Sequence, residues 1–214
     1  MHKLIYLWFG WVKAWGYLGV IVLMAMESSI FPVPSEVVIP PAAFWAAQGH
    51  MNKWGVILAG TFGSWLGSAI TYWVAAWLGR MIIVRWGKWF FISEEKLQRA
   101  EVFVHRYEAG GVFFARLLPV IRHLISIPAG LIRMNFALFS TMTVIGSFVW
   151  CWILAEFGAK VARESPGLIE NPEEMIHVIK HQSLTIVLFA VLFCGLYILA
   201  MRLTRPNPEP PSHA

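Results

Sequence analysis

The sequence predicts an all-α polytopic membrane protein, built as an inverted repeat of a re-entrant helical hairpin followed by a transmembrane helix. Three observations predict this fold. Of the 214 residues, 58% are hydrophobic and only 14% are charged, more apolar surface than a soluble domain of this length can bury. Several charge-free runs are long enough to cross a bilayer. Two further apolar segments contain prolines near their middles.

Three charge-free runs are the clearest spans. Residues 54–79 contain 26 such positions, residues 134–155 contain 22 and residues 184–201 contain 18. Crossing the hydrocarbon core of a bilayer takes about 20 residues of helix. Together with a retained first helix, preceded by an interfacial segment that carries Trp8 and Trp11, these runs predict about four full spans.

The whole chain is expected to form one membrane domain, 1–214, and no stretch has the composition of a separate soluble domain. Its expected segments, in order, are an N-terminal helix (1–26), the first hairpin plus span (27–79), a basic cytoplasmic amphipathic segment (80–107), the second hairpin plus span (108–159), an external loop (160–183), the last span (184–203) and a disordered tail (204–214).

Basic residues predict the orientation. They gather in residues 80–107 and near both termini, whereas acidic residues outnumber basic ones in residues 160–183. The positive-inside rule therefore places both termini and residues 80–107 in the cytoplasm, and residues 160–183 outside. The formal charge of +5 does not indicate a nucleic-acid partner, because these charges lie in short segments between apolar runs.

The remaining apolar segments, about 28–52 and 109–132, are predicted to enter and leave the membrane on the same face. If either segment crossed once, the basic clusters would no longer share a side. Each arm would have about 10 to 12 residues, half a bilayer at about 1.5 Å per helical residue. We therefore expect one re-entrant hairpin from outside and one from inside.

An internal repeat supports this arrangement. The sequence PAAF at 41–44 resembles PAGL at 128–131, and GSW at 63–65 resembles GSF at 146–148. Both copies combine a hairpin with a span, but they enter from opposite faces. Inverted repeats of this kind place a substrate site near the middle of the membrane, between the halves.

Four charged residues lie within the apolar segments: Glu27, Glu36, Arg116 and Arg122. A charge at membrane depth costs roughly 2.5 to 3.5 kcal/mol on insertion scales, so it persists where it is paired or faces a wet cavity. Nearby residues would break the hairpin helices and allow such a cavity. These hairpin-breaking or structural residues are Pro32, Pro34, Pro40, Pro41, Pro119, Pro128 and Gly130.

Two interpretations of these charges are compatible. In the first, salt bridges between the acids and the arginines tie the hairpins together. In the second, Arg116 and Arg122 bind an anion such as phosphate, for which the planar guanidinium offers a bidentate fork. Glu27 and Glu36 would then bind and release protons. The sequence predicts no catalytic residue, metal site or cofactor.

The motifs around these charges resemble a known family. The sequence ESSIFPVPSE followed by PPAAF, and then FFARLLPVIRH with IPAG, are similar to the DedA family of bacterial inner-membrane proteins, which share the VTT domain. The resemblance covers about residues 17–160. It implies that Glu27 and Glu36 are the functional acids and that Arg116 and Arg122 are the paired arginines. Some members have Asp, after a longer spacer, in place of Glu36.

The resemblance implies a flippase of the bacterial inner membrane that returns undecaprenyl phosphate to the cytoplasmic face, linked to the proton-motive force. We therefore expect membrane lipids and protons as partners. One alternative is a flippase for another phospholipid such as phosphatidylethanolamine, and another is a proton-coupled transporter of a small oxyanion. A scaffold or a membrane enzyme is a further possibility. The sequence leaves the oligomeric state open.

Overall fold

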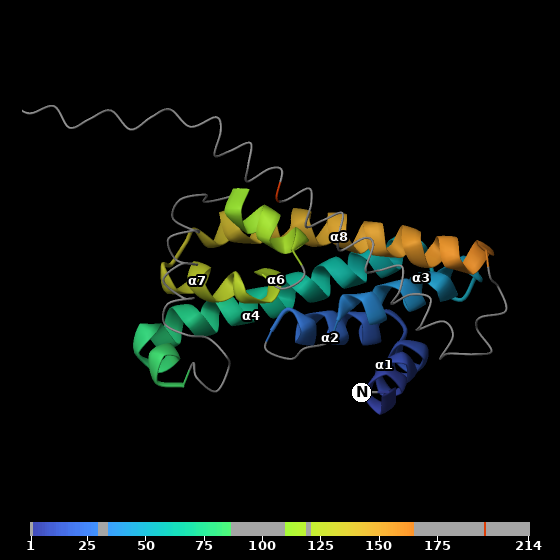
Figure 1. Cartoon of the computed structure of the whole chain (residues 1–214), viewed down its shortest axis with the longest axis horizontal. Coiled ribbons are helices and arrows are strands. Elements are labelled where there is room, and N and C mark those ends of the chain that lie inside the picture. The colour runs from blue at the N-terminus through green and yellow to red at the C-terminus, as the bar shows by residue number, and fades with distance from the viewer. Residues whose placement is uncertain (1, 30–33, 87–109, 119–120, 165–194, 196–214) are drawn as a thin grey trace, which may run out of the picture.

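The computed structural model describes residues 2–29, 34–86, 110–118, 121–164 and 195, and every regular element among them is helical (Figure 1). The predicted all-α class is confirmed for this part of the chain. The predicted last span, external loop and tail, and most of the basic segment, lie outside the described residues. The described elements are α1 (His2–Trp15), α2 (Tyr17–Glu27), the 3-10 turn η1 (Ser35–Val37), α3 (Ile39–Ala47), α4 (Lys53–Trp86), a helical stretch at 110–117, α6 (Ile121–Leu124), α7 (Ser126–Leu131) and α8 (Phe136–Glu164).

The N-terminal stretch is divided into α1 and α2 at Gly16. Gly16 has a φ of +55°, a backbone conformation that glycine adopts without a steric penalty. The 11-residue helix α2 ends in a turn at 28–29, and η1 followed by a turn at Val38 leads into the 9-residue helix α3. The described residues on either side of 30–33 form what we call the first bend. The stretch predicted as one N-terminal helix, 1–26, therefore forms two helices in the structure.

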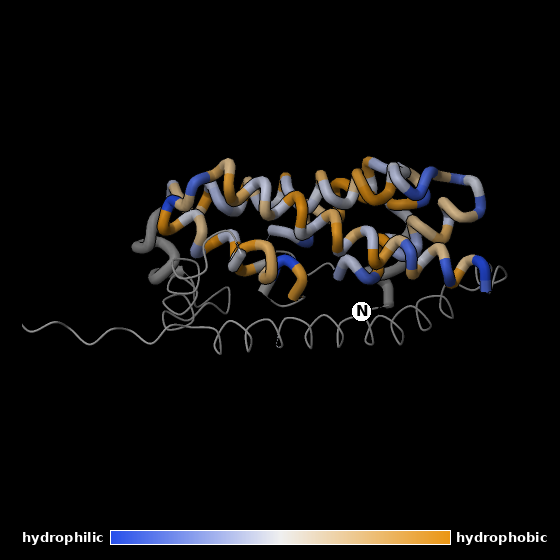
Figure 2. The backbone as a smooth tube through the Cα atoms, turned by 90° about the horizontal axis from the view of Figure 1, so that it is seen from above, coloured by the Kyte–Doolittle hydropathy of each residue, from blue (hydrophilic) through white to orange (hydrophobic). Residues whose placement is uncertain are grey.

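Two long helices, α4 and α8, span the length of the described structure (Figure 1). Among the described helices, α8 is the one whose length and apolar composition suffice to cross a membrane. Hydrophobic residues recur along both long helices (Figure 2). Both helices continue past the predicted ends of their spans, at 79 and 155, because the charged residues that follow are good helix formers.

The beginnings of the two long helices have the same cap. The side-chain oxygen of Asn52 accepts hydrogen bonds from the backbone N–H groups two and three residues further on, at 2.8 and 3.4 Å. Asn135 accepts the equivalent pair at 2.9 and 3.2 Å. Asparagine is a favourable N-cap because it satisfies these otherwise unpaired donors. Gly63 and Gly146 each lie 11 residues after their asparagine, so the caps occupy repeat-related positions.

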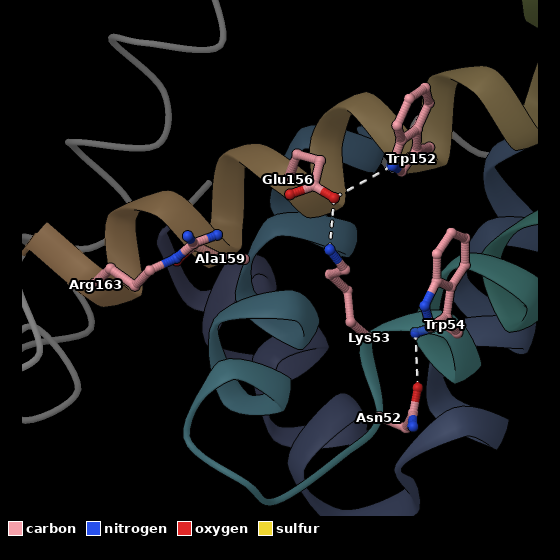
Figure 3. Close-up of polar contacts among 7 residues, drawn as sticks. All are labelled: Asn52, Lys53, Trp54, Trp152, Glu156, Ala159 and Arg163. Atoms are coloured by element: carbon pink, nitrogen blue, oxygen red, sulfur yellow. Dashed lines mark hydrogen bonds and ion pairs between the residues drawn. The ribbon is translucent and has the colours of Figure 1, made fainter.

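The C-terminal half of α8 is attached to the beginning of α4 (Figure 3). The Lys53 ammonium forms an ion pair with Glu156 at 2.5 Å. The indole of Trp152 donates a second hydrogen bond to the same carboxylate at 3.2 Å. This cluster is partly exposed, and it joins segments from the two copies of the repeat.

The short helices pack on the long helices with backbones in contact. In the first copy α2 lies against its own α4, whereas α3 lies against α8; in the second copy α7 lies against α4. A Cβ atom on Gly158 would collide with the backbone of Pro40, and one on Gly130 would collide with the backbone of Tyr72. Small residues permit this close approach of helices. Each copy thus packs a short helix on the long helix of the other.

The close approach of α3 to α8 predicts a specific stability defect. Gly158→Ala adds the Cβ that collides with Pro40, so we expect it to reduce the free energy of unfolding by about 1–3 kcal/mol. The matched control is Gly10→Ala, because Gly10 has no atom within 4 Å of an added Cβ. Thermal unfolding of the purified full chain in detergent measures both. Equal unfolding temperatures for the two variants would contradict the packing described here.

Candidate functional site

Glu27 is the last residue of α2 and is 1% exposed. Its carboxylate oxygen Oε1 accepts a hydrogen bond of 2.7 Å from the backbone N–H of Ser35, which begins η1. This N–H lies after residues 30–33, at the start of η1. It has no helical partner of its own, since it opens a new turn. Glu27 therefore holds together the two sides of the first bend.

Arg116 has the equivalent position at the end of the helical stretch 110–117 and is 3% exposed. Its Nη1 donates to the backbone carbonyl of Arg122 at 3.0 Å, and its Nη2 donates to the hydroxyl of Ser126 at 2.9 Å. Arg116 therefore joins the end of the helical stretch 110–117 to the beginnings of α6 and α7. We call the described residues on either side of 119–120 the second bend. The two bends are held by opposite chemistry, because a carboxylate accepts a backbone donor in the first and a guanidinium donates to a backbone acceptor in the second.

Glu27 and Arg122 join the two bends to each other. The Nη2 atom of Arg122, in α6, forms an ion pair with Oε1 of Glu27, and Arg122 is 6% exposed. Removing one partner of a buried ion pair typically costs about 3–5 kcal/mol, because it leaves the other charge uncompensated. Of the predicted salt bridges between the acids and the arginines, the one between Glu27 and Arg122 is therefore present.

Two aromatic residues of α8 flank the arginines. The Arg122 guanidinium carbon lies 5.5 Å from the ring centre of Trp150, and that of Arg116 lies 5.7 Å from the ring centre of Phe139. Both distances fall within the range of cation–π attraction. Trp150 belongs to one hydrophobic cluster and Phe139 to another, so the charged residues lie where the two cores meet.

The two arginines of the site differ in their contacts. Glu27 contacts Arg122, but the hydrogen bonds of Arg116 in the described part of the chain go to neutral oxygens only. A buried guanidinium without an anionic contact is costly, because desolvation is not offset by an opposite charge. Arg116 is therefore suited to binding an anion.

Glu36, the second predicted acid, lies in η1 and is half-buried. It is close enough for its charge to act on Arg122. The structure therefore brings all four predicted charged residues into one region. Of the two acids, Glu27 is the more deeply buried.

The predicted hairpin-breaking residues fall into three groups. Pro40 and Pro41 are buried in the first turn of α3, where proline is tolerated because its missing N–H would be unpaired anyway. Pro128 is similarly the third residue of α7, and Gly130 provides the close contact to α4. Pro34 is exposed just before η1. Pro32 and Pro119 lie outside the described residues.

Three neutral residues of the site were missed by the sequence analysis: Ser35, Ser126 and Trp150. Trp150 donates its indole N–H to the hydroxyl of Ser35 at 3.1 Å, so it connects α8 to the first bend. Ser126 receives the hydrogen bond from Arg116. The available signal was position alone, since Ser35 adjoins Glu36 and Ser126 lies one helical turn after Arg122.

Relatives of the chain are membrane proteins of several names. "Uncharacterized membrane protein YkoX" of Bacillus subtilis is 34% identical over 161 residues, which cover 75% of this chain and 71% of that protein. "Undecaprenyl phosphate transporter A" of the same bacterium is 29% identical over 194 residues, 91% of this chain and 92% of that protein. "Alkaline phosphatase-like protein" of Lactococcus lactis subsp. cremoris is 30% identical over 188 residues, 85% of each chain.

No solved structure is significantly similar to the chain. The VTT domain matches residues 33–160, which include η1, α3, α4, both arginines and most of α8. The resemblance seen in the two motifs is thereby confirmed over more than half of the sequence. The chain therefore belongs to the DedA family of membrane proteins, which carry the VTT domain.

Proposed function

We propose that this protein is a transporter of the bacterial inner membrane that moves a lipid with an anionic phosphate headgroup, and that its substrate is undecaprenyl phosphate, returned to the cytoplasmic face. The observation that carries the proposal is Arg116, a buried guanidinium with neutral partners only among the described residues. The relative named undecaprenyl phosphate transporter A, which aligns with 91% of this chain, supports the choice of lipid.

A phosphate monoester suits the site electrostatically. Arg116 supplies a guanidinium whose hydrogen bonds go to neutral oxygens among the described residues, and its planar fork can donate two parallel hydrogen bonds to phosphate oxygens. The attraction between a guanidinium and a phosphate is strong where water is scarce. A zwitterionic headgroup such as that of phosphatidylethanolamine would bring its own ammonium to this cationic site and bind less well.

The short helices support a site in the middle of the membrane. At about 1.5 Å per residue, the 11 residues of α2 extend about 16 Å, roughly half the 30 Å hydrocarbon core. If α2 starts near either surface of the membrane, Glu27 at its end lies at half depth. The second bend would reach the same depth from the cytoplasmic face, in agreement with the ion pair between Glu27 and Arg122.

Proton coupling would act through Glu27. In the structure its carboxylate pairs with Arg122, so protonation would release that guanidinium for the headgroup phosphate. Deprotonation would restore the pair and favour release of the lipid. Glu36, whose charge also acts on Arg122, would contribute more weakly. This cycle would link transport to the proton-motive force.

The first test of the proposal exchanges the arginine fork for an ammonium. Arg116→Lys keeps the charge but loses the bidentate geometry, so we expect transport of undecaprenyl phosphate into reconstituted vesicles to fall about tenfold or more. Arg163→Lys is the matched control, because Arg163 is an exposed arginine near the end of α8, and it should transport normally.

Competing headgroups make this assay specific. Excess phosphatidylethanolamine should not compete with undecaprenyl phosphate, and no inorganic phosphate should be released. Wild-type transport by Arg116→Lys would refute phosphate recognition by the fork. Release of inorganic phosphate would instead indicate hydrolysis of the lipid.

The acid Glu27 is tested with its near-isosteric amide. Glu27→Gln can still accept the hydrogen bond from Ser35, but it cannot ionise and leaves Arg122 without its partner. We expect a loss of about 3 kcal/mol or more in unfolding free energy, and transport in the incorporated fraction that no longer responds to an imposed pH gradient. Glu36→Gln should show a weaker effect, and Glu164→Gln, at the exposed end of α8, none. A full response of Glu27→Gln to the gradient would leave Glu27 a structural partner only.

Membrane orientation is tested with single cysteines in a chain without its two native ones. His50→Cys should react with an impermeant thiol reagent added outside intact cells, because residue 50 is exposed between α3 and α4 and is predicted to be external. His105→Cys, in the basic segment, should react only after permeabilisation. Reaction of position 50 from the cytoplasmic side alone would contradict the re-entrant first hairpin.

A further inference from the structure

Thr143 differs from several other helix hydroxyls in the described structure. Inside α4 and α8, several hydroxyls donate to the backbone carbonyl four residues earlier, at 2.6 to 2.9 Å; these are Thr61, Ser68, Thr71 and Thr141. Thr143 is 0% exposed, but its Oγ1 has no hydrogen-bond partner in the described part of the chain. A buried hydroxyl without a partner costs stability, and the usual local solution is not used here.

Thr143 lies beside the side chain of Arg116. A Cβ on Gly146 would lie 2.7 Å from Cβ of Arg116, and the Arg116 guanidinium lies over the ring of Phe139. Residues 139, 143 and 146 follow the three- and four-residue spacing that places them on one face of a helix. The side chain of Arg116 therefore runs along the face of α8 that carries Thr143, which lies between the two contacts.

One edge of the Arg116 guanidinium has no hydrogen-bond partner in the described part of the chain. A guanidinium has five N–H donors, and the two hydrogen bonds of Arg116 use only Nη1 and Nη2. Its Nε is buried and has no partner among the described residues. The hydroxyl of Ser140, three residues before Thr143, is a further buried group without a partner there. The described structure thus leaves Nε of Arg116 and the hydroxyls of Ser140 and Thr143 on α8 buried without a partner.

We propose that Thr143 is a phosphate ligand: its hydroxyl donates to one oxygen of a phosphate monoester whose other oxygens are bound by the Nε edge of Arg116. The inference rests on the proposed function and specifies where the headgroup binds. It explains why Thr143 forgoes the backbone bond that Thr141 makes. The same chemistry would fit a lipid phosphate or inorganic phosphate, so the test includes both.

The experiment uses three substitutions in the purified full chain in detergent. Thr143→Val removes the hydroxyl at nearly constant volume, Thr143→Ser keeps it, and Thr141→Val is the matched control on an exposed position of the same helix. Unfolding temperature is measured alone, with undecaprenyl phosphate and with inorganic phosphate. Transport of undecaprenyl phosphate is measured in vesicles at matched incorporation.

We expect opposite effects on stability and on binding. Without ligand, Thr143→Val should unfold at the wild-type temperature or above, because it removes an unpaired buried hydroxyl. Its apparent affinity for undecaprenyl phosphate should fall roughly tenfold, the size expected for one hydrogen bond to a charged group. Thr143→Ser should restore most of the affinity, and Thr141→Val should resemble the wild type. Stabilisation by inorganic phosphate as strong as by the lipid would assign the ligand site to a free oxyanion.

The outcomes separate this inference from the proposed function. If undecaprenyl phosphate binds to the wild type and equally well to Thr143→Val, the role of Thr143 is refuted and the proposed function stands. A Thr143→Val protein that is destabilised without ligand and binds normally would assign the hydroxyl a structural role. If neither phosphate compound stabilises the wild type and no lipid is transported, both proposals fail.

Discussion

The described structure depends on one buried ion pair, between Glu27 and Arg122. Each residue lies at a bend between short helices, in opposite halves of the repeat. Their pairing places the two bends against each other and offsets the cost of burying both charges, although such pairs are retained more for specificity than for net stability. Because Glu27 contacts Arg122, Arg116 keeps hydrogen bonds to neutral oxygens only among the described residues. The constraint that closes the fold therefore also defines the charge of the proposed binding site.

The packing around this pair explains how two small cores can form one structure. In the predicted repeat, a short helix of each copy packs on the long helix of the other, α3 on α8 and α7 on α4. Gly158 and Gly130 allow these backbones to touch. Trp150 and Phe139 extend one hydrophobic cluster each toward the arginines. A site at this junction is sensitive to any movement between the halves, which is what a transporter that alternates its access requires.

The sequence predicted the helical class and singled out the four charged residues that the structure brings into one region, because charge-free runs and buried charges are strong signals in an apolar chain. It predicted one N-terminal helix over 1–26, where Gly16 separates two helices, α1 and α2. It ended α4 at residue 79, although the helix continues to Trp86, because charge limits a span but does not end a helix. The roles of Ser35, Ser126 and Thr143 depend on tertiary contacts and unpaired atoms, which no residue spacing reveals.

The central claim is that the Arg116 guanidinium receives the phosphate of a lipid. The most direct measurement is an experimental structure of the protein with undecaprenyl phosphate bound in a lipid nanodisc. The account predicts phosphate oxygens at hydrogen-bond distance, about 2.7–2.9 Å, from the Arg116 guanidinium, with the Glu27–Arg122 pair next to them. A phosphate bound elsewhere, with Arg116 still paired only to the Arg122 carbonyl and Ser126, would contradict it.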